Sequence, residues 1–473
     1  MGAPLAIFRC TASPSVGWGH LRRCQALSRV LGDAGWRCEF ATAGECPAAL
    51  REKWPDGAAL LVTDGYEIDS VFEAACRPWA KRIVAIDDLA NRPHDADILV
   101  DHNAGRTAED YRHLVPEDCA IMTGPGFALL APEFFRQRIE RVPREAPQGR
   151  QRAIVVSLGG GAGEAQERAA GTILRALAAL GEGVAVTVVG GSDPAQRNPK
   201  ETAYRTLSGL TSSEMAQLLG EADLAIGAGG VSLLERFCVG LPSIVVTMAE
   251  NQRRGTAAGA ARGACADLGN AHDLVSDEIG RIVMRLTADK GAWIDTSRAA
   301  ARTTDGLGAA RVAASLASAA VRTTANPVTL RRATEEDAEL LLAWQSYPQT
   351  RKYARNPAIP SAAEHSAWLL DRLGRGTCIL NLIMWGRIPC GVLRLDRLSG
   401  DRSGYEVSVL TVPELQGRGI AREALRQARF LAGSADRWAW IDSENVRSQS
   451  LFAASGYLPQ GNGWYRDTRE LAA

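Results

Sequence analysis

The sequence has no surplus of charge of either sign. Its 473 residues carry 54 Lys and Arg side chains against 54 Asp and Glu side chains. Proteins that bind nucleic acid or an anionic membrane through long-range electrostatics usually have a basic surplus. We therefore expect neither nucleic acid nor a membrane as a partner, and we expect any anionic ligand to be held by a local group of residues.

Cysteine motifs are also missing. Ten cysteines are scattered between Cys10 and Cys390, and no two of them form a Cys-x-x-Cys pair. This distribution fits neither a zinc site nor a disulfide scaffold, and reduced thiols in the cytoplasm are the better interpretation. A second group of possible ligands has a spacing that matches no standard metal pattern, so we predict no metal site. That group is Asp87, Asp88, His94, Asp97 and His102.

Long hydrophobic runs are absent as well. No window approaches the roughly 20 uninterrupted apolar residues that a membrane span requires. The short apolar run from Leu5 to Phe8 lacks the preceding basic region and the longer hydrophobic stretch of an export signal. We therefore expect a soluble, cytoplasmic protein.

The chain does contain enough apolar material for several domains. Apolar residues make up 46% of it, and at about 150 residues per domain the length predicts three units. In the first two thirds, short aliphatic runs alternate with helical patterns, which is typical of parallel βαβ units. Composition shifts between Pro132 and Gln151 and again near Asn326-Pro327 indicate two doubly wound, Rossmann-type α/β domains followed by an α+β domain. The predicted ranges are 1–145, 150–322 and 327–473.

A glycine-containing turn precedes a predicted helix that begins near His20. Gly17 and Gly19 let the backbone turn sharply and approach a ligand, and the helix N-terminus offers free N–H groups with a partial positive charge. That field disfavours a protonated imidazole, so His20 is a candidate general base that takes a proton from water beside a bound sugar. The alternative is a plain structural turn with a helix cap.

A second glycine-rich turn runs from Gly227 to Glu235, between a predicted strand and a helix. Its backbone N–H groups are suited to a diphosphate. Glu235 lies about one turn into the helix, where a carboxylate can accept hydrogen bonds from ribose hydroxyls. The alternative is a tight strand–helix junction with a solvated Glu.

Several motifs between residues 5 and 320 together resemble one family. They are the Gly17-x-Gly19-His20 turn, Asp64-Gly65-Tyr66, the segment from Ile86 to Arg92, the segment from Gly124 to Leu130, the Gly229 to Glu235 turn, Glu250-Asn251-Gln252 and the segment from Asp305 to Val312. This region resembles the GT-B-like UDP-sugar hydrolases of pseudaminic acid biosynthesis.

The resemblance implies a function for each Rossmann-type domain. The first would bind the sugar and supply His20 as the base, and the second would hold UDP. Water would attack the anomeric carbon of UDP-2,4-diacetamido-2,4,6-trideoxy-β-L-altropyranose and release UDP without a metal. The implied binding residues are Gly17, Gly19, Asp64, Gly229, Gly230, Glu235, Asn251 and Gln252.

The last third carries Gln416-Gly417-Arg418-Gly419-Ile420-Ala421 after a predicted strand and at the start of a helix. Such a loop points consecutive N–H groups at a pyrophosphate, although an ordinary glycine turn is the alternative. It matches the signature of the GNAT acetyltransferases, and the spacing of Asn445, Ser448, Leu451-Phe452 and Gly456-Tyr457 matches a second element of that fold. Acetyl-CoA is therefore the implied co-substrate. The implied contacts are Val409, Leu410, the six residues of the loop, and Asn445.

Within the GNAT superfamily, residues 328 to 470 resemble the nucleotide-linked 4-amino-sugar N-acetyltransferase of the same pathway. The implied acceptor is UDP-4-amino-4,6-dideoxy-N-acetyl-β-L-altrosamine. Glu406 is either the base that deprotonates the amine or a structural strand carboxylate. Phe452 stands where many relatives have a Tyr that reprotonates the CoA thiolate, which leaves the general acid open, with Tyr457 as a neighbouring candidate.

Other functions remain compatible with these motifs. The first two domains also fit a glycosyltransferase, in which a hydroxyl group replaces water, or a UDP-sugar sensor without turnover. The third also fits a protein N-acetyltransferase. Hydrolysis is favoured because no exposed hydrophobic segment suits a lipid acceptor.

Overall fold

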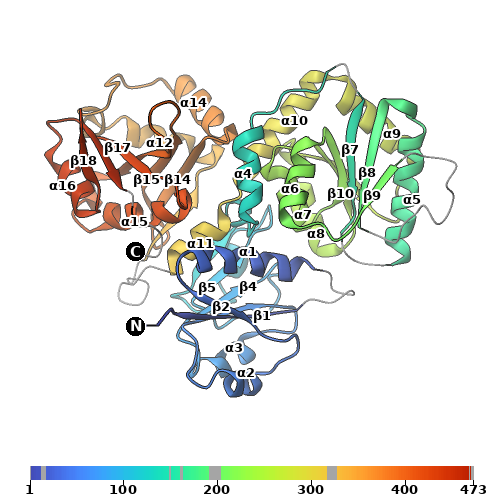
Figure 1. Cartoon of the computed structure of the whole chain (residues 1–473), viewed down its shortest axis with the longest axis horizontal. Helices are drawn as coiled ribbons and strands as arrows, with labels where there is room; N and C mark the ends of the chain where they lie inside the picture. Colours follow the sequence, from blue (N-terminus) through green and yellow to red (C-terminus); the bar gives the residue numbers. More distant parts are fainter. Residues whose placement is uncertain are drawn as a thin grey trace. The chain divides into compact units, whose positions relative to one another are not determined.

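The computed structural model describes residues 2–11, 18–148, 151–159, 163–190, 204–316, 327–467 and 469. The chain divides into two compact units. Unit 1 comprises Met1–Arg29 and Arg37–Gly308, and unit 2 comprises Val30–Trp36 and Ala309–Ala473. Within the described residues, unit 1 contains two sheets and unit 2 contains one (Figure 1).

The first sheet of unit 1 is parallel, in the order β2-β1-β3-β4-β5-β6. Its strands are β1 (Leu5–Cys10), β2 (Arg37–Phe40), β3 (Leu60–Asp64), β4 (Ile83–Ile86), β5 (Ile98–Asp101) and β6 (Ala120–Thr123). Every residue of β3, β4 and β5 is buried, as expected for aliphatic strands of a parallel sheet. The strand order reverses between β1 and β3, and ligands of doubly wound sheets bind at the carboxyl ends of the strands at such a reversal.

The second sheet is also parallel, in the order β12-β11-β10-β7-β8-β9. Its strands are β7 (Arg152–Ser157), β8 (Val184–Val189), β9 (Tyr204–Leu207), β10 (Leu224–Ala228), β11 (Ser243–Thr247) and β12 (Ala266–Asn270). Val155 belongs to one hydrophobic cluster, and its neighbours Ile154 and Val156 belong to another, so alternate side chains of β7 fill the cores on the two faces. The order reverses between β7 and β10, which places the Gly229 to Glu235 turn at a second reversal point.

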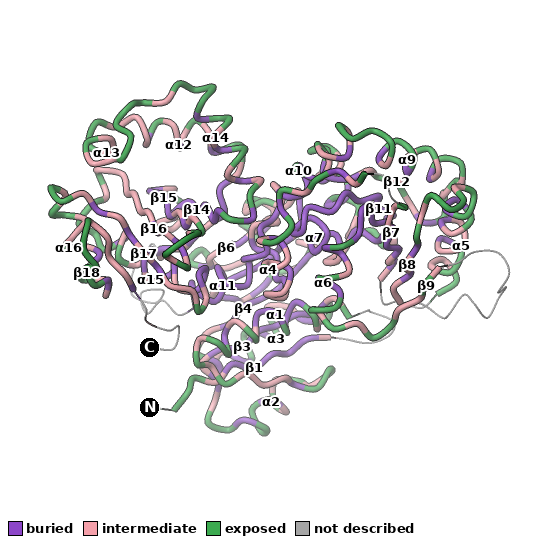
Figure 2. The backbone as a smooth tube through the Cα atoms, turned by 45° about the horizontal axis from the view of Figure 1, so that its top comes forward, coloured by how far each residue is buried: buried purple, intermediate pink, exposed green. Residues whose placement is uncertain are grey.

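Helices flank these sheets, and the central strands are buried whereas the outer strands β2, β9 and β12 are partly exposed (Figure 2). One helix, α4, follows the first sheet in the chain and packs against α6 and α7 of the second. Its buried Arg138 donates to the carbonyl oxygens of Cys238, 3.0 Å away, and Thr304, 3.1 Å away. The helices of this part of the chain are α1 (Gly19–Asp33), α2 (Pro47–Lys53), α3 (Ser70–Cys76), α4 (Pro132–Arg141), α5 (Glu164–Ala178), α6 (Ser212–Glu221), α7 (Val231–Cys238), α8 (Glu250–Ala261), α9 (Ser276–Ala288), α10 (Lys290–Thr303) and α11 (Gly308–Leu316).

The sheet of unit 2 is mixed, in the order β13-β14-β15-β16-β17-β19-β18. Its strands are β13 (Val328–Arg332), β14 (Cys378–Trp385), β15 (Ile388–Arg397), β16 (Tyr405–Thr411), β17 (Arg437–Trp440), β18 (Leu458–Gly461) and β19 (Trp464–Asp467). The helices are α12 (Ala338–Gln345), α13 (Pro348–Arg351), α14 (Ala362–Gly374), α15 (Ile420–Ala432) and α16 (Val446–Ala454). All neighbouring strands are antiparallel except β16 and β17, which are parallel.

The predicted fold class is confirmed: parallel, Rossmann-like sheets are followed by a mixed α+β domain. The predicted boundaries at 145–150 and 322–327 stay predictions. Among the residues that the structure describes, no helix has the length and apolar character needed to cross a membrane.

Candidate active sites

A cavity of about 830 Å³ opens in unit 1 where the carboxyl ends of the strands of its two sheets supply the walls. Its lining includes most of the residues that the sequence singled out in this part of the chain. Those residues are Gly19, His20, Gly229, Gly230, Glu235, Asn251 and Gln252. Asp64 lies behind this lining, fully buried, and Gly17 lies outside the described residues.

His20 and Asp64 form a buried pair at the cavity. His20 is the second residue of α1, and Asp64 is the last residue of β3, so the reversal between β1 and β3 brings them together. The Nδ1 atom of His20 lies 2.5 Å from Oδ1 of Asp64. Burial alone would raise the pKa of Asp64, but the charge and hydrogen bonds of Arg23 and His20 lower it to about 2. Asp64 is therefore ionised at neutral pH and can only accept hydrogen bonds.

Arg23 completes this arrangement. Its Nε donates to Asp64 Oδ2 at 2.6 Å, and its Nη1 donates to Asp88 Oδ2 at 3.2 Å. Nη2 also lies 2.9 Å from Nδ1 of His20. Because a guanidinium only donates, and because Asp64 requires a proton on Nδ1, the Nη2 contact is not a hydrogen bond.

The proton on Nδ1 leaves Nε2 of neutral His20 with its lone pair. Within the described residues, Nε2 has no hydrogen-bond partner. A carboxylate that fixes the tautomer of a histidine is the arrangement of a general base oriented by an acid. The ring edge of Tyr66 packs against His20, with 5.0 Å between the ring centroids. His102 also lines the cavity, and burial together with the charge of Arg23 lowers its pKa to about 3, so its ring is neutral.

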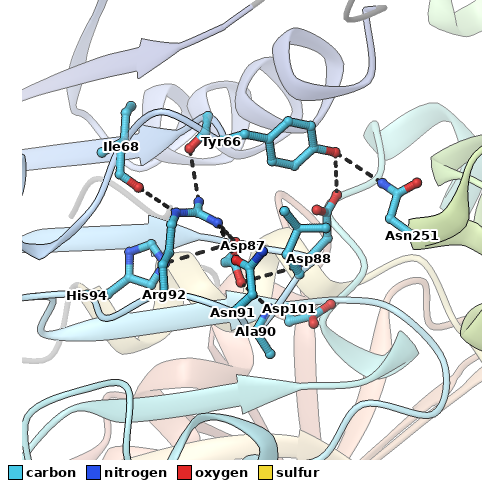
Figure 3. A network of polar contacts seen from close by, with 12 residues as sticks. Tyr66, Ile68, Asp87, Asp88, Ala90, Asn91, Arg92, His94, Asp101 and Asn251 are labelled. Atoms are coloured by element: carbon cyan, nitrogen blue, oxygen red, sulfur yellow. Dashed lines mark hydrogen bonds and ion pairs between the residues drawn. The ribbon is translucent and has the colours of Figure 1, made fainter.

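Asp87 and Asp88 have different roles (Figure 3). Asp87 accepts from the N–H groups of Leu89 and Ala90 and pairs with Arg92 at 2.7 Å, so it caps the loop. Asp88 lines the cavity and accepts from the Tyr66 hydroxyl at 3.5 Å. Burial and the nearby Asp88 raise the pKa of Tyr66, which therefore keeps its proton.

Asn251 reaches the same network from the second sheet. Its Nδ2 donates to the Tyr66 hydroxyl at 3.0 Å, as Figure 3 shows. On the same helix, Arg254 forms two bonds to Asp110, the shorter at 2.7 Å. Helix α8 is thus hydrogen-bonded to the loops of the first sheet, and Asn251 links the predicted sugar side of the cavity to the predicted UDP side.

Gln252 has a structural contact that the sequence did not indicate. Its Oε1 accepts from the N–H groups of Gly229, at 3.2 Å, and Met248, at 3.0 Å. The N–H of Gly229 is therefore occupied. A Cβ at Gly229 would lie 2.3 Å from Thr256 Oγ1, so this glycine is required for close packing. The donors that remain at this turn belong to the N-terminus of α7, which begins at Val231.

Glu235 is the fifth residue of α7 and is buried at the cavity wall. Burial raises its pKa to about 7, although the charges of Arg22 and Arg236 oppose this shift. Arg22 is exposed and lines the cavity, so it is a cation on the same side as the start of α7. The carboxyl group of Glu235 can donate to a hydroxyl group when it is protonated and accept from one when it is ionised.

Sequence reasoning missed two lining residues, Arg22 and Arg23. Tyr66 was named only as part of a motif, and Asp88 and His102 only in the group that was rejected as a metal site, yet all three line the cavity. For Arg23 a signal existed, because a residue three positions after His20 on a helix lies on the same face. For His102 and Asp88, nothing in the sequence indicated that they lie near His20, because only the pairing of distant strands brings them there.

The glycine loop of unit 2 has the geometry of an anion-binding turn. Gly417 and Gly419 both have φ of +80°, and Gly419 is the N-cap of α15. The N–H groups of Gly417, Arg418 and Gly419 have no acceptor within the described part of the chain, and a Cβ at either glycine would meet open space. The Arg418 guanidinium lies over the ring of Trp385, with its Cζ 5.3 Å from the ring centroid. Ile420 and Ala421 open the helix, whose dipole favours an anion here.

Strands β16 and β17 separate beyond their first two residues. In the part of the chain that the structure describes, they pair only at Tyr405–Arg437 and Glu406–Trp438, whereas β16 pairs with β15 over its whole length. Val409 and Leu410 lie in the part of β16 that is separated from β17. Among the described residues, no strand pairs there with the edge of β16 that faces β17. An extended ligand can supply such backbone hydrogen bonds.

Other predicted residues of unit 2 have their own partners. Asn445 caps α16 by accepting from the N–H of Ser448 at 3.1 Å, and Gln416 donates to the Thr411 carbonyl at 3.3 Å. Glu406 forms an ion pair with Arg355. Tyr457 is 1% exposed, packs edge-on against Phe452, and has its pKa raised by burial, which makes it a poorer proton donor.

Comparison with known proteins separates the two parts of the chain. Residues 328–457 match the acetyltransferase (GNAT) domain model. The N-terminal region is 29% identical over 150 residues to the UDP-2,4-diacetamido-2,4,6-trideoxy-β-L-altropyranose hydrolase of Campylobacter jejuni, covering 28% of this chain and 54% of that protein. The chain joins a region similar to a UDP-sugar hydrolase to a GNAT domain. The predicted resemblances to the UDP-sugar hydrolases and to the GNAT acetyltransferases are confirmed.

Two further similarities are more limited. The spore coat polysaccharide biosynthesis protein SpsG of Bacillus subtilis is 39% identical over 89 residues, which covers 17% of this chain and 26% of that protein. The spermidine N-acetyltransferase of Vibrio cholerae, solved with CoA and spermine, is 17% identical with a TM-score of 0.27, covering 29% of this chain and 92% of that one. The chain thus spans about half of the hydrolase and about a quarter of SpsG.

The His20–Asp64 pair can be tested directly. In the neutral ring we expect the proton on Nδ1, and we expect Asp64→Asn to give a mixture of tautomers, because an amide can either donate or accept. Two-bond ¹H–¹⁵N correlation spectra of histidine-labelled protein report the tautomer, with His20→Ala to assign the signal. Glu67→Gln, on the loop that follows β3, is the matched control and should leave the spectrum of His20 unchanged. A neutral His20 protonated on Nε2 in the unmodified chain would contradict the assignment.

Proposed function

We propose that the cavity of unit 1 hydrolyses a UDP-linked sugar and that the GNAT domain transfers an acetyl group from acetyl-CoA to a UDP-linked amino sugar. The observation that carries the first activity is the lining of one cavity by both His20 and the Gly229 to Glu235 element. A base with a fixed tautomer then faces a helix N-terminus suited to a diphosphate.

The hydrolytic step needs only this chain's residues and water. Nε2 of His20 takes a proton from water, the oxygen attacks the anomeric carbon, and the bond from that carbon to the β-phosphate oxygen breaks. UDP leaves with the bonding electrons. The N-terminus of α7 and the Arg22 guanidinium stabilise the charge that develops on the diphosphate.

The remaining contacts divide between substrate and framework. Glu235 is assigned to the ribose hydroxyls, and Asp88 and His102 to the sugar side with His20. Asn251 is assigned to the junction of sugar and diphosphate because it bonds Tyr66. Gln252 and Gly229 are assigned to shaping the turn, since they bond each other.

In the GNAT domain, the loop from Gln416 to Ala421 is assigned to the pyrophosphate of acetyl-CoA. Val409 and Leu410 are assigned to its extended arm, because β16 has unpaired backbone groups there. Asn445 supports this side by capping α16. Glu406 is assigned as the base for the amine.

We further propose that the two reactions are those of pseudaminic acid biosynthesis and that acetylation comes first. The acceptor would be UDP-4-amino-4,6-dideoxy-N-acetyl-β-L-altrosamine, and the hydrolase substrate its 4-N-acetylated product. UDP is a large charged group by which a small amino sugar can be bound, and hydrolysis first would remove it. The hydrolase of Campylobacter jejuni is named for the diacetamido sugar.

His20→Ala should lower the rate of UDP release by about 10² to 10⁴ while leaving UDP binding intact, because the base is lost and the α7 turn is not. A coupled assay for UDP and calorimetry with UDP measure the two properties. His113→Ala removes an exposed histidine that does not line the cavity and is the control. Near-normal turnover in a folded His20→Ala protein would reject the role of the base.

Gly419→Trp should weaken acetyl-CoA binding by about tenfold or more, because the large side chain fills the space in front of the N–H groups. Gly400→Trp is a matched control, since Gly400 also has positive φ and open space around a Cβ. Calorimetry with acetyl-CoA gives the affinities. If the two variants bind acetyl-CoA equally well, the loop does not hold the pyrophosphate.

The order of the reactions can be read from UDP release. With the UDP-linked 4-amino sugar as substrate, release should be at least about tenfold faster when acetyl-CoA is present, because a site that hydrogen-bonds an acetamido group leaves polar partners unpaired against an ammonium. Following free thiol in parallel shows that acetylation precedes release. Equal rates of UDP release with and without acetyl-CoA would overturn this order.

A further inference from the structure

Glu406, the assigned base of the GNAT domain, is held by Arg355. Nη2 of Arg355 lies 2.8 Å from Oε1 of Glu406, and Nη1 lies 3.2 Å from Oε2. Both carboxylate oxygens are therefore engaged by one guanidinium in a two-point ion pair. While this pair is intact, the side of the carboxylate that faces Arg355 is occupied and is not available to an amine.

Arg355 rests on an aromatic surface. Its guanidinium lies 4.8 Å from the ring centroid of Trp440 and 5.4 Å from that of Trp464. Directly paired residues of neighbouring strands share a face, so Trp438 lies on the same face as Glu406, and Trp440 lies beside Trp464. All three Trp rings are partly exposed. A guanidinium stacked in this way keeps its N–H edges free to change partners.

The same surface carries additional positive charge. The Arg402 guanidinium lies 4.5 Å from the centroid of Trp464 and has no carboxylate partner among the described residues. The Arg466 guanidinium lies 5.1 Å from the ring centroid of Trp438 and forms an ion pair with Asp436. Arg355 and Arg402 therefore both lie over the ring of Trp464, so an anionic ligand at this ring is near positive charge.

The ion pair is suited to exchange. The Arg355 side chain is 52% exposed and follows the short helix α13, whereas the Glu406 side chain is 16% exposed. Ion pairs with an exposed partner contribute little to stability, so a stronger anion can displace one. A diphosphate carries more charge than a carboxylate and binds a guanidinium at two points.

We propose that Arg355 is a positioning residue that acts as a substrate-operated switch. In the free domain it holds Glu406, and when an amine linked to a nucleoside diphosphate binds, Arg355 moves to the diphosphate and leaves Glu406 free to act as the base. This inference rests on the proposed acetyltransferase function. It makes the diphosphate a requirement for turnover as well as for binding.

The chemistry after the exchange balances without another reactant. The freed Glu406 carboxylate takes one proton from the acceptor ammonium, and the neutral amine attacks the thioester carbon of acetyl-CoA. The carbon–sulfur bond breaks, and the thiolate takes the second proton that the nitrogen loses. The products are the N-acetylated acceptor, CoA thiol and protonated Glu406, which returns its proton to solvent.

The test compares two acceptors on the full chain by initial rates of thiol release. One is the UDP-linked amino sugar, and the other is the same amino sugar without the nucleotide. In Arg355→Gln we expect KM for the linked acceptor to rise about tenfold or more, because a charge-assisted phosphate contact is lost. We also expect kcat for the unlinked sugar to rise about threefold to fivefold, because Glu406 is no longer held.

Matched variants separate the switch from simpler roles. Arg402→Gln should raise KM for the linked acceptor without raising kcat for the unlinked sugar, because Arg402 does not pair with Glu406. Arg355→Lys should restore part of the affinity for the linked acceptor. An unchanged or lower rate with the unlinked sugar in Arg355→Gln would overturn the switch. No thiol release from either acceptor in the unmodified chain would reject the proposed acetyltransferase function instead.

A binding measurement tests the exchange without turnover. If Glu406 competes for Arg355, Glu406→Gln should tighten binding of inorganic pyrophosphate in calorimetry by about threefold to fivefold. The gain should be smaller when Glu406→Gln is added to Arg355→Gln, which removes the competition. An equal gain in both backgrounds would mean that Glu406 acts only by repelling the anion, and the switch would be overturned.

Discussion

The buried charge of Asp64 is the constraint on which the candidate hydrolase site depends. A carboxylate without solvent is costly unless its oxygens are paired, and removing one partner exposes that cost. Arg23 and His20 supply the pairing, and both are on the first two turns of α1. The position of α1 is therefore tied to the carboxyl end of β3, and the histidine has one tautomer as a consequence. The contacts that pair the buried charge of Asp64 are therefore also the contacts that orient the base.

Backbone motifs were predictable from the sequence because they are local. Alternating aliphatic runs indicated the parallel sheets, and the glycines at 229, 230, 417 and 419 indicated turns that precede helices. His20 could be singled out because it follows a strand and opens a helix. These signals need only neighbours in the chain, so no knowledge of the tertiary structure was required.

Side-chain partners across the chain were not predictable. Gln252 was assigned to the nucleotide, yet it bonds the Gly229 backbone, 23 positions away. Glu406 was predicted to be either a base or a structural strand carboxylate, and its partner Arg355, 51 positions earlier, was not predicted. From the sequence, a neutral His20 was predicted only from its place at a helix N-terminus. In the structure, Asp64, 44 positions later, fixes the position of its proton. Each contact depends on strand order or loop path, which composition and spacing do not encode.

The two-residue pairing of β16 with β17 has a consequence for cooperativity. Strands β17, β19 and β18 are hydrogen-bonded to one another, but within the described residues their only ladder pairs with the rest of the sheet are Tyr405–Arg437 and Glu406–Trp438. This arrangement makes the last three strands a candidate foldon, with a seam at which amide protection should drop first. Any ligand that occupies the separated part of β16 would join the two pieces of the sheet and raise the opening free energy of both. The C-terminal strands would then report ligand occupancy through their exchange rates, even at amides that the ligand never touches.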